Sequence, residues 1–148
     1  MEEDEFRATY HQVNQRRCRF EKAINAQRVG CHQAETFLLA GREGIACGSA
    51  PAQRRCEQLL QRLREAARFS LMRTRVDGPL PHNAELRVQA GGLQGIAALL
   101  VDAGGPGVTD VCALLDRARE RFGALEQWPY SDIVRHMARF RGRRRHRT

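Results

Sequence analysis

Apolar residues recur at helical spacing through most of the chain. In the first 28 residues they lie three, four or seven positions apart, which would gather them on one face of a helix. These positions are Phe6, Tyr10, Val13, Phe20 and Ile24. The spacing predicts a first helix over about 3–28, ended by Gly30, and a second helical segment over about 31–43.

The remaining pattern predicts four more helices separated by segments rich in proline and glycine. Ser49 can cap a third helix that runs to about residue 73, with Cys56 on its apolar stripe. The breakers VDGPLPHN and AGGPG then bound a fourth helix that ends at Leu100. The last two helices are expected over 109–122 and 131–140. No convincing strand is found, so the predicted fold class is all-α, a compact bundle of five to six helices.

Three glycines lie inside the fourth predicted helix, where each costs about 1 kcal/mol relative to alanine. They are Gly91, Gly92 and Gly95. Tight packing against another backbone explains them better than a ligand contact, because GGLQG lacks the lysine of a phosphate-binding loop.

The chain is expected to form a single helical domain over 1–138, followed by a basic tail over 139–148. A cysteine-bearing half covers about 1–75 and a glycine-bearing half about 83–138. The hydrophobic share is 42% of 148 residues, enough for one domain with a core.

The composition favours a cytoplasmic protein that does not contact the membrane. No apolar run approaches the roughly 20 residues that span a bilayer, and the start MEEDEF is acidic where a signal peptide would be basic. In a reducing compartment stable disulfides are not expected, and clustered cysteines then point to metal binding or redox chemistry.

Four of the five cysteines are candidate metal ligands: Cys18, Cys31, Cys47 and Cys56. Twelve, fifteen and eight residues separate them, unlike the C-x2-C knuckle of most zinc sites or the tight run of a ferredoxin. Wide spacing is still compatible with a cluster whose ligands come from separate elements. The alternatives are buried thiols without a metal, a zinc ion held with His11 or His32, and a redox-active cysteine.

The expected positions of these cysteines differ. Cys18 lies off the apolar face of the first predicted helix, Cys31 follows Gly30 at a predicted helix start, and Cys47 lies in a glycine-flanked loop. Cys112 is interpreted as a helix residue with no chemical role. No hydrolase, phosphate-loop or dinucleotide motif is present, which favours a protein that is not an enzyme.

The formal charge of +8 is concentrated in the tail. Its arginines are candidate contacts for nucleic acid or an acidic protein partner, since each phosphate that they neutralise releases counterions. They are Arg139, Arg141, Arg143, Arg144, Arg145 and Arg147. The simpler interpretation is a frayed, soluble chain end.

The blocks CRFEKAI, AETFLLAGREGIAC, RFSLMRTRVDGPLPH and VQAGGLQG resemble a group of small uncharacterised proteobacterial proteins with four spaced cysteines. The resemblance covers roughly half of the chain and implies a bacterial source but no established activity.

Taken together, the sequence predicts a small cytoplasmic iron–sulfur protein, with [4Fe–4S] favoured, that serves electron transfer, redox sensing or a larger redox enzyme. The alternatives are a metal-free helical interaction module and a nucleic-acid-binding accessory protein that uses the arginine tail.

Overall fold

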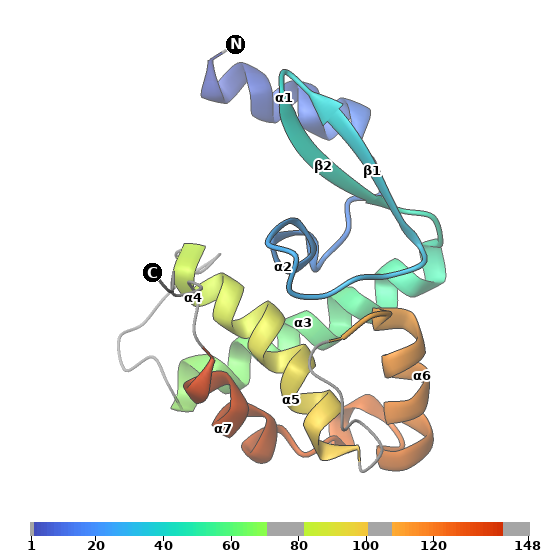
Figure 1. Cartoon of the computed structure of the whole chain (residues 1–148), viewed down its shortest axis with the longest axis vertical. Coiled ribbons are helices and arrows are strands. Elements are labelled where there is room, and N and C mark those ends of the chain that lie inside the picture. The colour runs from blue at the N-terminus through green and yellow to red at the C-terminus, as the bar shows by residue number, and fades with distance from the viewer. Residues whose placement is uncertain (1, 71–81, 101–107, 141–148) are drawn as a thin grey trace, which may run out of the picture.

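The computed structural model describes residues 2–70, 82–100 and 108–140, in a mostly helical fold with one two-stranded antiparallel sheet (Figure 1). The predicted break at 103–107 and residues 76–81 of the predicted break VDGPLPHN lie outside these residues, whereas His82 and Asn83, which end that break, begin a helix. Among the described helices, none is both long and apolar enough to cross a membrane. The elements are α1 (Glu3–Val13), α2 (Glu21–Asn25), β1 (Ala34–Leu39), β2 (Arg42–Cys47), α3 (Ala50–Ser70), α4 (His82–Leu86), the π-helical turn η1 (Arg87–Gly91), α5 (Gly92–Leu99), α6 (Val111–Phe122), the 3₁₀ turn η2 (Leu125–Gln127) and α7 (Tyr130–Arg139).

The prediction of a purely helical fold is wrong at residues 34–47, which form a β-hairpin. Strands β1 and β2 pair in register from Ala34 opposite Cys47 to Leu39 opposite Arg42. The two-residue turn uses Ala40 and Gly41, both with positive φ (52° and 80°), as the twist of a tight hairpin requires. The apolar spacing of this stretch is also compatible with a helix. The Ala-Gly pair at the turn is the sequence feature that favours the hairpin.

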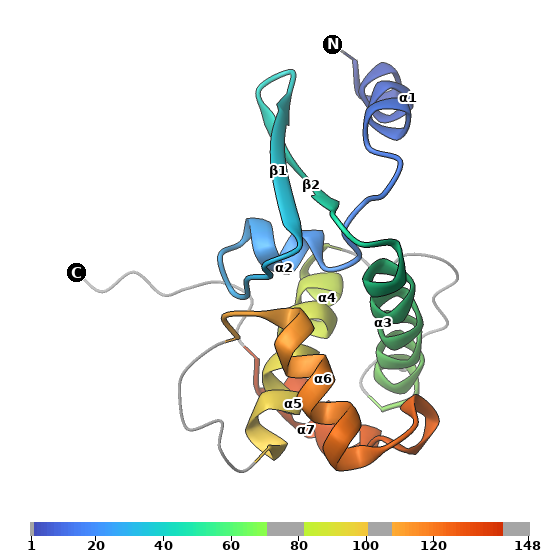
Figure 2. The ribbon, with the colours of Figure 1, turned by 90° about the vertical axis from the view of Figure 1, so that its right-hand side faces the viewer.

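The predicted first helix over 3–28 is also wrong in its extent, because it is split into two. Helix α1 ends at Val13, and α2 begins only at Glu21. Between them the chain runs beside β2, where Arg17 pairs with Ala46 in an isolated antiparallel bridge. Pairing with a distant strand has overridden the local helical pattern. Helix α1 and the hairpin extend together from one end of the helical body (Figures 1 and 2).

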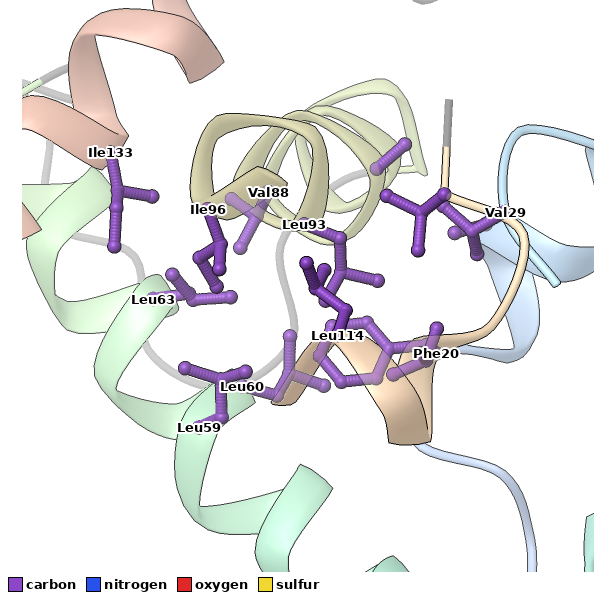
Figure 3. Packing of buried hydrophobic residues seen from close by; sticks show 14 of the residues in the cluster. Phe20, Val29, Leu59, Leu60, Leu63, Val88, Leu93, Ile96, Leu114 and Ile133 are labelled. Atoms are coloured by element: carbon purple, nitrogen blue, oxygen red, sulfur yellow. The ribbon is translucent and has the colours of Figure 1, made fainter. Parts of the chain in front are cut away.

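The later helices lie close to where the sequence predicts them. Helix α3 begins after Ser49, whose hydroxyl accepts a hydrogen bond from the backbone N–H of Ala52 at 3.2 Å, so the predicted N-cap is confirmed. Helices α6 and α7 match the predicted segments to within a residue or two. One hydrophobic cluster joins α3, α5, α6 and α7 with residues before β1 (Figure 3). The buried members labelled in Figure 3 are Phe20, Val29, Leu59, Leu60, Leu63, Val88, Leu93, Ile96, Leu114 and Ile133.

The close approach predicted at the helical glycines is confirmed. A Cβ on Gly91 would lie 3.1 Å from the Cα of Met137, and one on Gly95 would lie 3.1 Å from the carbonyl oxygen of Ile133 and 2.9 Å from the Cβ of His136. The glycines therefore let the backbone of α7 lie directly against η1 and α5.

Substitution of Gly95 by alanine is expected to destabilise the fold. Helix propensity alone would favour alanine by about 1 kcal/mol, but the contact with α7 forces the two helices apart. We expect a net loss of roughly 1–2 kcal/mol in the free energy of unfolding, measured by urea denaturation. Gln94→Ala in the same helix is the control and should change stability by less than about 0.5 kcal/mol. Equal or greater stability of Gly95→Ala would contradict the packing argument.

Candidate metal centre

All five cysteines line one pocket, although they come from five separate segments of the chain. Its cavity volume is about 20 Å³, room for about one water molecule between the side chains. Apolar side chains complete much of its wall, among them Phe20, Ile24 and Val111. All five cysteines are free thiols. The structure thus brings together the four cysteines singled out in the sequence and adds Cys112.

A first backbone pairing brings Cys18 beside Cys47. The N–H of Cys18 donates to the carbonyl of Ile45 at 2.9 Å, and the N–H of Cys47 donates to the carbonyl of Arg16 at 2.7 Å. The segment before α2 therefore runs alongside β2 and is joined to it by an isolated antiparallel bridge. Because neither hydrogen bond depends on a side chain, the placement follows from the register of the hairpin.

A second backbone pairing brings Cys31 beside Cys112. Val29 and Val108 form a parallel bridge, the N–H of Gly30 donates to Val108 at 2.9 Å, and the N–H of Val111 donates to Gly30 at 2.8 Å. The Sγ atoms of Cys31 and Cys112 lie 3.5 Å apart, within hydrogen-bond distance for sulfur. This pair joins the start of α6 to a segment 81 residues earlier in the chain.

The fifth thiol, Cys56, comes from α3. It is buried on the apolar stripe of that helix, as the sequence predicts, with 9% of its surface exposed. Burial raises its pKa, and the nearby thiols of Cys18, Cys112 and Cys31 add to the rise. Cys56 is therefore close enough to interact electrostatically with thiols of both cysteine pairs, Cys18 with Cys47 and Cys31 with Cys112.

The structure corrects the local setting of three cysteines. Cys18 lies in the extended link between α1 and α2 rather than on a long helix, Cys31 precedes β1 rather than opening a helix, and Cys47 ends β2 rather than lying in a loop. Cys112, interpreted from the sequence as a helix residue with no chemical role, also lines the pocket. It is the second residue of α6, so Cys112, rather than Cys31, lies at a helix start, where the positive end of the helix dipole favours a thiolate.

The pocket disfavours thiolates when nothing is bound. Burial raises the pKa of Cys18 to about 12, the thiols of Cys31 and Cys47 add to the rise, and the backbone N–H of Phe20 opposes it. Burial, the hydrogen bond with Cys31 and the proximity of its thiol raise the pKa of Cys112 to about 12. These thiols are therefore protonated at neutral pH unless a cation replaces their protons.

One group in the described part of the chain has the spacing of a single-ion site. The Sγ atoms of Cys31 and Cys112 and a carboxylate oxygen of Asp110 lie within 4.8 Å of one another. His32 contacts Asp110 through its ring nitrogen Nδ1 at 2.7 Å and donates its backbone N–H at 3.2 Å. Burial alone would raise the pKa of Asp110, but these hydrogen bonds outweigh it and lower that pKa. His11 lies exposed on α1 and does not line the pocket.

A buried carboxylate fixes the segment that carries Cys18. Glu21, 6% exposed, accepts a hydrogen bond from the N–H of Ile45 at 2.7 Å and another from the hydroxyl of Tyr10. The guanidinium of Arg17 pairs with the same carboxylate at 2.7 Å. Asn14 adds a hydrogen bond to the carbonyl of Ile45 at 2.9 Å. The network ties α1, the Cys18 segment and β2 together.

The structure describes only the first of the six tail arginines. Arg139 ends α7 and is exposed, whereas Arg141, Arg143, Arg144, Arg145 and Arg147 lie outside the described residues.

Comparison of the chain with known protein families, curated proteins and solved structures finds no match. The pocket and its chemistry are therefore the features of the chain that point to a function.

Removal of the buried carboxylate is expected to be costly. Glu21→Ala leaves the N–H of Ile45, the hydroxyl of Tyr10 and the charge of Arg17 without their partner, so we expect a loss of about 2–4 kcal/mol in the free energy of unfolding. Glu57→Ala removes an exposed ion pair with Arg19 and should cost less than about 0.5 kcal/mol. Urea denaturation of both variants measures the difference. Similar losses would show that Glu21 does not anchor the segment.

The raised thiol pKa values predict slow alkylation of the folded, metal-free protein. At pH 8 a shift of the pKa of Cys18 or Cys112 to about 12 lowers the thiolate population strongly. The greater nucleophilicity of a basic thiolate recovers only part of that loss. We expect at least ~10-fold slower reaction with iodoacetamide than in the urea-unfolded chain, read by peptide mass spectrometry. Equal rates in the two states would be incompatible with the buried, protonated pocket.

Proposed function

We propose that the protein binds an iron–sulfur cluster, most simply [4Fe–4S], in this pocket through Cys18, Cys31, Cys47 and Cys56. The observation that carries the proposal is the convergence of thiols from separate segments on one largely apolar pocket. Packing alone does not account for this convergence, because a buried thiol packs like a small hydrophobic side chain and needs no sulfur neighbours. A shared ligand does account for it. Thiolates are the ligands that iron–sulfur clusters use.

The positions of the five thiols argue against a single ion as the ligand of the full set. A tetrahedral ion with metal–sulfur bonds of about 2.3 Å holds its thiolates roughly 3.8 Å apart. Among the described residues only Cys31, Cys112 and Asp110 form a group of three or more with so close a spacing. Cys18, Cys47 and Cys56 line the same pocket outside that group, as ligands of a larger inorganic core would.

The chain's own residues would shape the properties of such a centre. The backbone N–H of Phe20 is directed at the sulfur of Cys18 and stabilises its negative charge. Phe20, 1% exposed, and Val111, 1% exposed, limit the access of water to the sulfurs. Each thiol must release a proton on binding, so loading becomes easier as the pH rises. When bound, the cluster supplies one-electron transfer, either for redox sensing or for a partner redox enzyme in a reducing cytoplasm.

A zinc ion is the second candidate, because one observation favours it. The spacing of Cys31, Cys112 and Asp110 suits one tetrahedral ion, and His32 would orient the carboxylate through its ring hydrogen bond. That site would depend on Cys112 and Asp110 and would leave Cys18 and Cys47 without a role. An interaction module or a nucleic-acid-binding protein that acts through the arginine tail needs neither set of ligands.

The test is anaerobic expression and purification without chelators, followed by iron, zinc and sulfide analysis and a visible spectrum of the same sample. We expect a brown protein with a broad band near ~400 nm and about four irons per chain. Cys18→Ala and Cys47→Ala should each lose most of the iron while the metal-free variants keep the helical circular dichroism of the native chain. One zinc per chain that depends on Asp110 would instead select the second candidate. A colourless, metal-free and folded protein would reject both.

A further inference from the structure

The pocket contains one thiol more than a four-iron cluster needs. Cys112 lies against Cys31, and no sequence signal marked it as a ligand. It is buried, with 6% of its surface exposed, and its sulfur faces the same pocket as the other four. A role for the fifth thiol must therefore follow from its geometry relative to Cys31.

The separation of the two sulfurs restricts how they can bind. In a four-iron cluster each thiolate binds a different corner iron, so ligand sulfurs stand roughly 6–7 Å apart. The sulfurs of Cys31 and Cys112 lie 3.5 Å apart. Both sulfurs are therefore placed to bind the same corner iron of a four-iron cluster, and that iron needs only one of them.

The backbone holds this pair at nearly the same place. Gly30 exchanges hydrogen bonds with Val108 and Val111, so the residues just before Cys31 and just before Cys112 are joined directly. Both side chains therefore start from one backbone junction and line the same pocket. Exchange of one sulfur for the other needs a change of side-chain rotamer and a small backbone shift, without disruption of either element.

We propose that Cys31 and Cys112 are interchangeable ligands of one iron. When one binds as the thiolate, the other remains a thiol and donates its S–H to the bound sulfur. Hydrogen bonds to cluster sulfur raise the reduction potential, so the unbound thiol also tunes the centre. This proposal rests on the proposed cluster, and it assigns Cys112 a part in binding that Cys18 and Cys47 do not share.

The test compares four variants, each loaded anaerobically with ferrous iron and sulfide: Cys31→Ala, Cys112→Ala, the double variant and Cys47→Ala. Alanine is used because serine can bind iron through its oxygen. We expect both single variants at the junction to keep about four irons per chain, and the double variant and Cys47→Ala to lose most of that iron. Cys112→Ala should also titrate at a more negative midpoint potential than the wild type, because the donor to Cys31 is gone.

Each contrary result overturns a defined part of the account. Loss of the cluster in Cys31→Ala alone would show that Cys112 cannot replace it, and loss in Cys112→Ala alone would make Cys112 an obligatory ligand. Either would reject the exchange while leaving the cluster in place. Retention of the cluster in the double variant would show that neither Cys31 nor Cys112 is needed as a ligand, which rejects the proposal that they share one iron. A wild-type chain that takes up no iron would reject the proposed function and this inference together. Circular dichroism melting of each metal-free variant separates loss of ligand from loss of fold.

Discussion

The pairing of the segment before α2 with strand β2 is the constraint on which the site depends. Two backbone hydrogen bonds join residues 16–18 to residues 45–47, and the buried carboxylate of Glu21 bonds to the N–H of Ile45 within the same stretch. Without this pairing the local pattern favours a continuous helix, which would carry Cys18 away from Cys47. The hydroxyl of Tyr10 and the guanidinium of Arg17 provide the other hydrogen bonds to Glu21. The buried negative charge of Glu21 is therefore paired and hydrogen-bonded.

The second half of the site depends on the helical body. Helix α6 is held against the residues before β1 by the bridge between Val29 and Val108, and α3 supplies Cys56 from the side that faces the core. The glycines of η1 and α5 let α7 pack closely enough to close that core. The pocket therefore lies where the hairpin, α3 and α6 meet, and it requires distant parts of the chain to be folded together.

The sequence was informative where structure is local and uninformative where it depends on distant pairing. Helices α3, α6 and α7, the cap at Ser49 and the packing role of Gly91 and Gly95 follow from periodicity and residue chemistry. The hairpin could not be recognised from apolar spacing, because AETFLLAGREG satisfies a helical pattern as well as two short strands. Its signal was the Ala-Gly pair, which a two-residue turn with positive φ accommodates.

The candidate ligands show the same division. The four cysteines could be grouped by residue type alone, but their pairing as Cys18 with Cys47 and Cys31 with Cys112 depends on hydrogen bonds that no local pattern encodes. Periodicity places Cys112 on the inward face of a regular helix, where a small buried thiol is ordinary, so the sequence does not group it with the other four.

The most direct test of the central claim is native mass spectrometry of the full chain, purified and sprayed under anaerobic conditions. A chain that binds the cluster has a mass greater than that of the polypeptide by four irons and four sulfides, with a loss of protons that matches thiolate formation. A mass equal to that of the bare polypeptide, in a protein whose charge-state distribution is that of a folded chain, would contradict the central claim.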